Sequence, residues 1–475
     1  MLTPAACAYG AGARERTQSY PNGYDCTIRQ TSVVAEAFPA ATEPLPSPAV
    51  ANPLDTLIER GFVQDISDGD AVRDLLAEGP TTFYYGCDPT ASALHIGNLV
   101  GLMAAAWLQR SGHRAIALAG GGTGRIGDPS FRDDERQLLA EEVIAHNLER
   151  IREQMGRLID IEDSSRGILV DNHDWLGELG LLDFLRDVGK HFSVNQMIAR
   201  ESVRRRLEER EQGISFTEFS YQLLQAYDFA HLHAAEGCML QIGGSDQWGN
   251  ITAGIELTRR LHGARVHGFT WPLIERSDGK KISKSTNTDA PVLAGDETSP
   301  YAFYQWFFNI PDADVDRFLR LFTFLPLDEI AGVVAEGEND PSARTPQRPL
   351  AEEITRLVHG DDGLEVARRA SEILFGSEPF VGLDDRTIDD AFSAAPSVTL
   401  ERALLGSIGL LELMVQAGAA ASNGAARRLV TQGAVLVNNA PVDEPTTTIT
   451  EAHLIGSDAV VLRTGRKSYH LVRFR

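Results

Sequence analysis

The stretch Thr81–Asn98, TTFYYGCDPTASALHIGN, decides the fold class of this chain. Aromatic and β-branched residues at 82–85 are typical of a strand, Gly86 and Pro89 interrupt that strand, and an apolar pattern at helical spacing follows. His95 therefore lies where a strand passes into a helix. Open α/β sheets bind ligands at the carboxyl ends of their parallel strands, so this junction is a predicted ligand site.

The composition is that of a globular protein with more than one domain. A length of 475 residues exceeds one core of ordinary size and predicts two to four domains. No apolar run reaches the roughly 18 residues that a membrane span needs. The net charge of −23 argues against a protein that binds nucleic acid through charge alone. The four cysteines, Cys7, Cys26, Cys87 and Cys238, form no CxxC pair, so they predict neither a disulfide framework nor a zinc site. Free cysteines fit a reducing compartment, and we expect the protein to be cytoplasmic.

Strands and helices alternate from Pro53 to about residue 285, which predicts an α/β domain with a parallel sheet and right-handed crossovers. The predicted strands are Thr81–Tyr85, Arg114–Ala119, Ile168–Asp171, Met239–Ile242 and Gly268–Ile274, and the predicted helices lie near 95–111, 136–158 and 216–231. The first domain is therefore assigned to residues 53–289.

The remaining segments differ in character. Residues 1–52 are rich in Pro, Ala, Ser and Thr and predict a flexible extension, which is either dispensable, a start assigned too early or an organellar transit peptide. Amphipathic patterns without competing strands predict an all-helical domain over 290–395. A linker over 396–408 then leads into a small α+β unit over 409–475.

Charge distinguishes the end of the chain from the rest. Residues 421–475 contain seven Lys and Arg, among them Arg427 and Arg428, against four acidic residues, a net charge of +3. A basic module on an acidic protein indicates RNA bound at one face. An ordinary solvated cationic surface is the alternative that charge alone leaves open.

Two other segments contain residues suited to phosphate chemistry. In 120–130, GGGTGRIGDPS, five glycines allow close approach of the backbone to a ligand, although a tight turn without a ligand would look the same. Asp128 supplies a carboxylate for an amine or a hydroxyl. In 278–285, DGKKISKS, Lys281 and Lys284 suit a charge-dispersed phosphoryl transition state, and an exposed lysine cluster is the alternative.

Three basic or helix-capping side chains complete this picture. Backbone N–H groups at the helix start and the ring of His95 suit an anionic phosphate chain, whereas a capping histidine without a ligand is the simpler alternative. Arg132 and Arg136 follow the glycine loop and could reach phosphates or form surface ion pairs with their acidic neighbours.

The order and spacing of these motifs carry a resemblance. HIGN and KISKS, about 185 residues apart, resemble the HIGH and KMSKS signatures of class I aminoacyl-tRNA synthetases, with Asn98 in place of the second His and Ile282 in place of Met. YGCDPTASALHIGN, GGTGRIGDPS, YQLLQAYD and QIGGSDQWGN resemble bacterial-type tyrosyl-tRNA synthetases, and the likeness runs from Pro53 to the C-terminus.

The resemblance implies a fold and an activity. It implies a Rossmann-type catalytic domain, a helical domain for the anticodon arm and a C-terminal RNA-binding domain. The implied reaction joins L-tyrosine to ATP, giving tyrosyl-adenylate and pyrophosphate, and then transfers tyrosyl to the 3′ end of tRNA(Tyr). Magnesium would enter with ATP, without a fixed protein metal site, and the enzyme would be a homodimer.

The resemblance also assigns roles to single residues. On the helix near 216–231, Tyr221, Gln225 and Asp228 stand at positions i, i+4 and i+7 and therefore share one face. Packing alone would make that face apolar. These three belong to the implied tyrosine site, which consists of Tyr84, Asp128, Tyr221, Gln225, Asp228, Gln241 and Gln247. The implied ATP site consists of Asp88, His95, Asn98, Gly244, Asp246, Lys281 and Lys284. The implied catalytic residues are Thr90, His95, Lys281, Lys284, Arg132 and Arg136, and the implied RNA-binding residues are Arg427 and Arg428.

Two other functions compete with this one. A tryptophan-activating relative shares the signatures, but the pair Tyr84 and Asp228 and the basic C-terminal unit argue against it. A non-catalytic RNA-binding paralogue would keep the fold, but the intact His95, Lys281 and Lys284 argue for catalysis.

Overall fold

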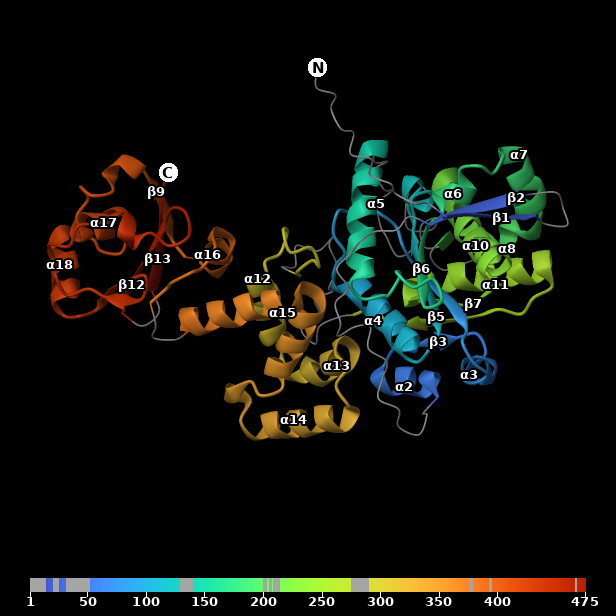
Figure 1. The fold of residues 1–475 in the computed structure, drawn as a ribbon, viewed down its shortest axis with the longest axis horizontal. Helices are drawn as coiled ribbons and strands as arrows, with labels where there is room; N and C mark the ends of the chain where they lie inside the picture. Colours follow the sequence, from blue (N-terminus) through green and yellow to red (C-terminus); the bar gives the residue numbers. More distant parts are fainter. Residues whose placement is uncertain are drawn as a thin grey trace, which may run out of the picture. The chain divides into compact units, whose positions relative to one another are not determined.

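The computed structural model describes residues 14–19, 25–30, 52–128, 140–199, 203–204, 207, 214–274, 290–375, 379–392, 395–465 and 468–475. The chain forms two compact units that alternate along the sequence (Figure 1). One unit contains Met1–Ala294 and Pro311–Pro346, and the other contains Gly295–Ile310 and Gln347–Arg475.

The first unit is built on a six-stranded sheet with the order β3-β8-β7-β4-β5-β6. Its strands are β3 (Asp65–Ile66), β4 (Thr82–Cys87), β5 (Arg114–Ala119), β6 (Gly167–Asp171), β7 (Cys238–Gly244) and β8 (His267–Trp271). All neighbouring strands are parallel except β3, which pairs antiparallel with β8. The predicted parallel α/β fold is thus confirmed. From β4 the chain builds outward through β5 and β6, and it later returns to the other side of β4 to build β7 and β8. The strand order therefore reverses between β4 and β7.

Most helices of this unit precede or connect the strands, whereas α13 and α14 follow the last strand along the chain (Figure 1). They are α2 (Pro53–Arg60), α3 (Gly69–Ala77), α4 (Ile96–Arg110), α5 (Glu141–Gly156), α6 (His173–Leu176), α7 (Leu181–Asp183), α8 (Val194–Ile198), α10 (Phe216–Glu236), α11 (Trp248–His262), α13 (Asp312–Phe322) and α14 (Leu327–Asn339). Helix α4 is buried along nearly its whole length because it is apolar on all sides. β5 is a continuous apolar run, as expected of a parallel strand covered on both faces.

The predicted helical domain over 290–395 is divided between the two units. Helix α13 lies in the first unit, where it contacts α2 and α4, and Arg60 at the end of α2 binds its carboxyl end. The buried Arg60 guanidinium donates to the main-chain oxygens of Arg320 at 3.1 Å, Thr323 at 3.1 Å and Leu325 at 2.5 Å. It also stacks 4.0 Å above the ring of Trp107 in α4. Burial, together with the charge of Arg320, lowers the pKa of Arg60 to about 10.

The second unit combines helices with a mixed five-stranded sheet. Its helices are α12 (Pro300–Phe308), α15 (Gln347–Phe375), α16 (Asp385–Ala391), α17 (Leu410–Gln416) and α18 (Asn423–Thr431). Its sheet has the order β11-β10-β12-β13-β9, with β9 (Ser397–Leu400), β10 (Val435–Val437), β11 (Ala440–Pro441), β12 (Ala459–Thr464) and β13 (Ser468–Phe474). Gly360 breaks α15 with a φ of 75°.

The predicted linker over 396–408 is wrong at its start, since Ser397–Leu400 forms β9. This strand pairs in parallel with β13, from Ser397 opposite Leu471 to Leu400 opposite Phe474. The four residues are alternately exposed and half-buried, so they lack the apolar run that would have indicated a strand. Helices and sheet share one core in this unit, where Phe380 packs with Val461 and Leu471.

The N-terminal segment contains a short hairpin. β1 (Arg14–Ser19) pairs antiparallel with β2 (Asp25–Gln30), in a region that we predicted to be flexible throughout. No helix in the described ranges is long and apolar enough to cross a membrane.

The Arg60 contacts predict a large loss of stability in Arg60→Met. The variant leaves three carbonyl groups without their donor and removes the stacked cation, and we expect it to lower the free energy of unfolding by about 3 kcal/mol. Urea denaturation followed by tryptophan fluorescence measures this change. Arg265→Ala is the control, because Arg265 pairs with Asp68 on the surface and is 73% exposed. Its effect should stay within about 0.5 kcal/mol, and an equal effect of both variants would contradict the prediction.

Candidate active site

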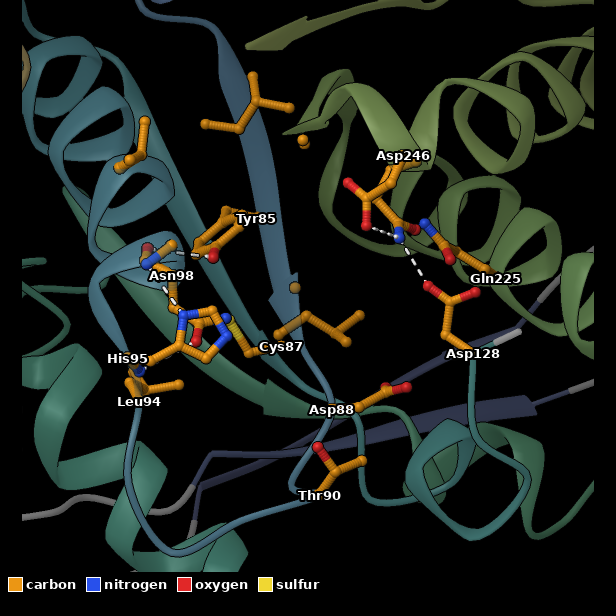
Figure 2. A pocket seen from close by; sticks show the side chains of 18 of the residues that line it. Tyr85, Cys87, Asp88, Thr90, Leu94, His95, Asn98, Asp128, Gln225 and Asp246 are labelled. Atoms are coloured by element: carbon orange, nitrogen blue, oxygen red, sulfur yellow. Dashed lines mark hydrogen bonds between the residues drawn. The ribbon is translucent and has the colours of Figure 1, made fainter. Parts of the chain in front are cut away.

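A polar cavity of about 350 Å³ opens at the carboxyl ends of β4 and β7. This is the point where the strand order reverses, and a volume of this size suits a small ligand. Figure 2 shows His95 and Asn98 on one side of the cavity and Asp128, Gln225 and Asp246 on the other. Its described lining contains no Lys or Arg but has four carboxylates, those of Asp88, Asp128, Asp228 and Asp246.

One part of the cavity holds two buried groups, Tyr84 of β4 and Asp228 of α10, each 2% exposed. Asp228 accepts hydrogen bonds from Trp175 Nε1 at 2.8 Å and Asn172 Nδ2 at 2.9 Å. The Tyr84 hydroxyl has no hydrogen-bond partner among the described residues. Buried polar groups in proteins are normally paired, so this hydroxyl indicates a ligand with a polar atom.

Burial determines the protonation of both groups. It raises the pKa of Asp228 to about 8, although the two donors oppose the shift. Burial and the nearby Asp228 charge raise the pKa of Tyr84 well above its ordinary value. Tyr84 therefore remains a neutral hydroxyl that can donate, while Asp228 titrates close to neutral pH.

A second group of side chains lies around Asp128. Gln247 Nε2 donates to Asp128 Oδ2 at 2.6 Å. Asn250 donates to Gln225 Oε1 at 3.0 Å and to Gln247 Oε1 at 3.1 Å, and it thereby orients both glutamines. The carboxylate and the glutamine oxygens form an acceptor-rich region that suits an ammonium group. Tyr221 donates its hydroxyl proton to Asp88 Oδ2 at 2.8 Å, so its oxygen presents lone pairs to any other donor.

His95 has a fixed ring orientation at the start of α4. Its Nδ1 accepts a hydrogen bond from the Gly97 N–H at 2.9 Å, which assigns the ring proton of the neutral form to Nε2 as a donor. Gly97 has to be a glycine, because a Cβ there would lie 2.6 Å from the imidazole. The sequence motif therefore builds a helix cap and a directed N–H donor together.

Asn98 takes part in the same cap. Its Oδ1 accepts from the His95 backbone N–H at 3.1 Å, and its Nδ2 points to Cys87 Sγ at 3.8 Å. Tyr85 donates its hydroxyl proton to the Asn98 main-chain oxygen at 3.2 Å. The Asn98 amide oxygen thus serves the helix cap, while its Nδ2 has a second proton with which to donate.

The glycine loop is packed against the protein itself. A Cβ on Gly120 would lie 2.2 Å from Asp88 Oδ1, and one on Gly121 would lie 2.3 Å from Asp171 Oδ1. Thr123 Oγ1 donates to Asp88 Oδ1 at 2.6 Å inside this loop. Glycine is required here for contacts within the protein, whether or not the loop also approaches a ligand.

Thirteen of the predicted site residues line the cavity: Tyr84, Asp88, Thr90, His95, Asn98, Asp128, Tyr221, Gln225, Asp228, Gln241, Gly244, Asp246 and Gln247. Four others lie outside the described residues: Arg132, Arg136, Lys281 and Lys284. Arg427 and Arg428 are exposed on α18 in the second unit. Within the described ranges, no group of three His, Cys, Asp or Glu is placed to hold a metal ion.

Sequence reasoning missed the residues that hold the site residues in place, which are Thr123, Asn172, Trp175 and Asn250. Asn172 and Trp175 follow directly after β6, so the rule that strand ends carry ligand sites was a usable signal. Their bonds to Asp228 join segments more than 50 residues apart, which no local pattern indicates.

Comparisons with known proteins agree with the geometry. Residues 76–376 match the family model of class I tRNA synthetases (W and Y), and residues 387–472 match that of the tyrosine–tRNA ligase SYY-like C-terminal domain. The chain is 47% identical to the tyrosine–tRNA ligase of Opitutus terrae over 423 residues, which cover 88% of this chain and 99% of that protein. It is 45% identical to the enzyme of Yersinia enterocolitica over 427 residues, covering 89% and 99%.

A solved structure shows the same likeness. The C-terminally truncated mitochondrial tyrosyl-tRNA synthetase of Aspergillus nidulans superposes with a TM-score of 0.63 at 32% identity, covering 69% of this chain and 95% of that one. The resemblance stated from the motifs is confirmed, and this chain belongs to the tyrosine–tRNA ligase family of class I tRNA synthetases.

Proposed function

We propose that this protein is a tyrosine–tRNA ligase that activates L-tyrosine with ATP and transfers the tyrosyl group to the 3′ end of tRNA(Tyr). The buried Tyr84 hydroxyl beside Asp228 is the observation that carries the choice of amino acid. A phenol can accept from Tyr84 and donate to Asp228, whereas a phenyl ring would leave the Tyr84 hydroxyl unpaired and would offer Asp228 no further donor. Tyrosyl-tRNA synthetases are the standard example of this kind of selectivity.

The other end of the substrate fits the acceptor-rich region. The tyrosine ammonium would be held by Asp128, Gln225 and the lone pairs of Tyr221. The tyrosine carboxylate then attacks the α-phosphate of ATP, the bond to pyrophosphate breaks, and tyrosyl-adenylate forms. This reaction needs no protein nucleophile, so the enzyme contributes positioning and electrostatic stabilisation.

The ATP phosphates require positive charge that the described lining does not provide. His95 would donate its Nε2–H to a phosphate oxygen, assisted by Thr90. Lys281 and Lys284, with Arg132 and Arg136, would supply cations to the departing pyrophosphate, and Mg²⁺ would enter as part of the substrate. The ribose would meet Asp246 and the close backbone at Gly244, where a Cβ would lie 2.4 Å from Asp246 Oδ1.

Pyrophosphate exchange with each of the twenty amino acids tests this function. Tyrosine should support exchange far better than any other amino acid. A preference for tryptophan would replace the proposal by the tryptophan-activating alternative. Absence of exchange with tRNA binding retained would identify a non-catalytic paralogue.

The pKa of Asp228 makes tyrosine binding depend on pH. Only the ionised Asp228 carboxylate accepts a hydrogen bond from the phenol, and the fraction that is ionised increases as the pH rises through the pKa of about 8. The KM for tyrosine should therefore fall by roughly 20-fold between about pH 6.5 and about pH 8.5. Asp228→Asn keeps the shape but does not titrate, so its KM should be higher and nearly constant across this range. Exchange kinetics at several pH values measure both profiles.

The KM for ATP in the same assays is the control, and it should change little with pH in this range. A flat tyrosine profile in the unmodified enzyme would contradict the assignment. A slope that persists in Asp228→Asn would place the titrating group elsewhere.

The basic face of α18 supports an RNA-binding role for the C-terminal module. A deletion from about residue 407 cannot test it, because β9 would remain without its partner β13 and Phe380 would lose Val461 and Leu471. Point substitutions on the exposed helix surface avoid this damage.

The double variant Arg427→Gln, Arg428→Gln should raise the KM for tRNA by about tenfold and leave pyrophosphate exchange unchanged, because it removes two phosphate contacts. Aminoacylation at several salt concentrations measures the effect, and the salt dependence should weaken. Arg368→Gln on α15 is the matched control, since Arg368 is similarly exposed but lies outside the basic module. Equal losses in both variants would contradict the role of α18.

We propose that the enzyme is a cytoplasmic homodimer. Exposed apolar side chains concentrate between residues 181 and 216, where Leu181, Leu182 and Phe216 are 70% to 79% exposed and Val194 is 56% exposed. Such a concentration favours burial against a second copy of the chain. Two free buried thiols, Cys87 and Cys238, fit a reducing compartment.

Leu182→Asp tests the dimer, because a carboxylate in an apolar interface costs desolvation energy on association. We expect the variant to shift toward monomer in size-exclusion chromatography with light scattering. Ile58→Asp on α2 is the control, since Ile58 is an exposed apolar residue outside this segment. A dimer that withstands both substitutions would move the interface elsewhere.

A further inference from the structure

A chain of hydrogen bonds connects the tyrosine end of the cavity to the ATP end. Asn172 Nδ2 donates to Asp228 Oδ2 at 2.9 Å and to Thr123 Oγ1 at 2.9 Å. Thr123 Oγ1 donates to Asp88 Oδ1 at 2.6 Å. Asn172, Thr123 and Asp228 are all at most 2% exposed, so water does not compete for the two bonds that Asn172 donates, whereas Asp88 is half-buried at the cavity. We call this chain, Asp228–Asn172–Thr123–Asp88, the relay.

The direction of each bond in the relay is determined by its surroundings. The Asn172 Oδ1 accepts from the backbone N–H of Gly122 at 2.8 Å and of Thr123 at 3.3 Å. The amide nitrogen must therefore face Asp228 and Thr123, and both of its protons are in use. Because the Thr123 oxygen accepts one of them, its own proton goes to Asp88. The donor and acceptor of each bond that Asn172 and Thr123 make are therefore fixed.

Both ends of the relay return to the same helix. Asp228 lies on α10, and Asp88 accepts at its second oxygen from Tyr221, which lies two turns earlier on α10. Gly120 leaves the space for the Thr123–Asp88 bond, since a Cβ there would lie 2.2 Å from Asp88 Oδ1 and 2.5 Å from Thr123 Oγ1. The relay and α10 together form a closed ring of contacts, and Asp88, Thr123, Tyr221 and Asp228 of this ring line the cavity.

We propose that Thr123 is a positioning residue that couples tyrosine binding to ATP binding through the relay. The proposal rests on the function proposed above for Asp228 and Asp88. A phenol that donates to Asp228 changes how strongly this carboxylate accepts from Asn172, and serial hydrogen bonds transmit such a change because each polarises the next. Asp88 is thereby held in the geometry that receives ATP. Coupling of this kind is reciprocal, so bound nucleotide strengthens tyrosine binding by the same factor.

Binding measurements on the full chain test the coupling. The dissociation constant of tyrosine is measured by calorimetry with and without saturating α,β-methylene-ATP, which cannot release pyrophosphate. We expect the nucleotide to lower this constant about fivefold in the unmodified enzyme. The coupling ratio is the dissociation constant of tyrosine without nucleotide divided by that with nucleotide. Thr123→Val keeps the side-chain shape but lacks the hydroxyl, so this ratio should fall to about one. Thr123→Ser keeps the hydroxyl and should restore the ratio.

Two further variants separate coupling from a structural effect. Thr258→Val is the matched control, because Thr258 is fully buried in the same unit and its hydroxyl donates to the Gly254 oxygen at 2.8 Å, away from the relay. Its ratio should equal that of the unmodified enzyme. Gly120→Ala keeps the Thr123 hydroxyl but forces it away from Asp88, so it tests the same bond if Thr123→Val does not fold.

The outcomes distinguish this proposal from the proposed function. A ratio of one in the unmodified enzyme, or an unchanged ratio in Thr123→Val or Gly120→Ala, overturns the coupling role while tyrosine-dependent exchange stands. Failure of the unmodified enzyme to bind tyrosine overturns the proposed function itself.

Discussion

The buried carboxylate of Asp228 is the constraint on which the catalytic unit depends. An ionisable group that is 2% exposed is expensive unless its oxygens are paired, and here the donors are uncharged. The pairing needs α10 to present Asp228 toward the end of β6, where Asn172 and Trp175 follow the strand. The two hydrogen bonds do not fully offset the effect of burial, so the pKa of Asp228 stays raised. The carboxylate therefore remains able to accept a further hydrogen bond from a ligand.

Local pattern was sufficient to find the five parallel strands, but it missed β3 and predicted β8 to end three residues too late. β5 occurs at the residues where alternation and apolar content predicted it, and β4, β6 and β7 begin within one residue of their predictions. The helices α12 and α15 lie in the region that the amphipathic pattern predicted to be helical. Parallel strands and long amphipathic helices are encoded by neighbouring residues, so a reading of the sequence alone detects them.

Long-range contacts explain what sequence reasoning could not predict. The contacts that place α13 in the first unit are long-range, and they include bonds from Arg60 to residues more than 250 positions away. β9 exists because β13 provides a partner, and its own four residues carry no apolar signal. In the site, motif likeness named residues that line the cavity, but it did not name Asn250 or Thr123, whose bonds hold Gln225 and Asp88 in place.

The alternation of the two units along the chain has a consequence for biosynthesis. The polypeptide passes from one unit to the other three times, after Ala294, after Ile310 and after Pro346. A ribosome that has completed the six-stranded sheet has not yet made the carbonyl groups that the Arg60 guanidinium binds. The first unit therefore reaches its final set of contacts only after part of the second has been synthesised, and no single cut in the chain releases either unit whole.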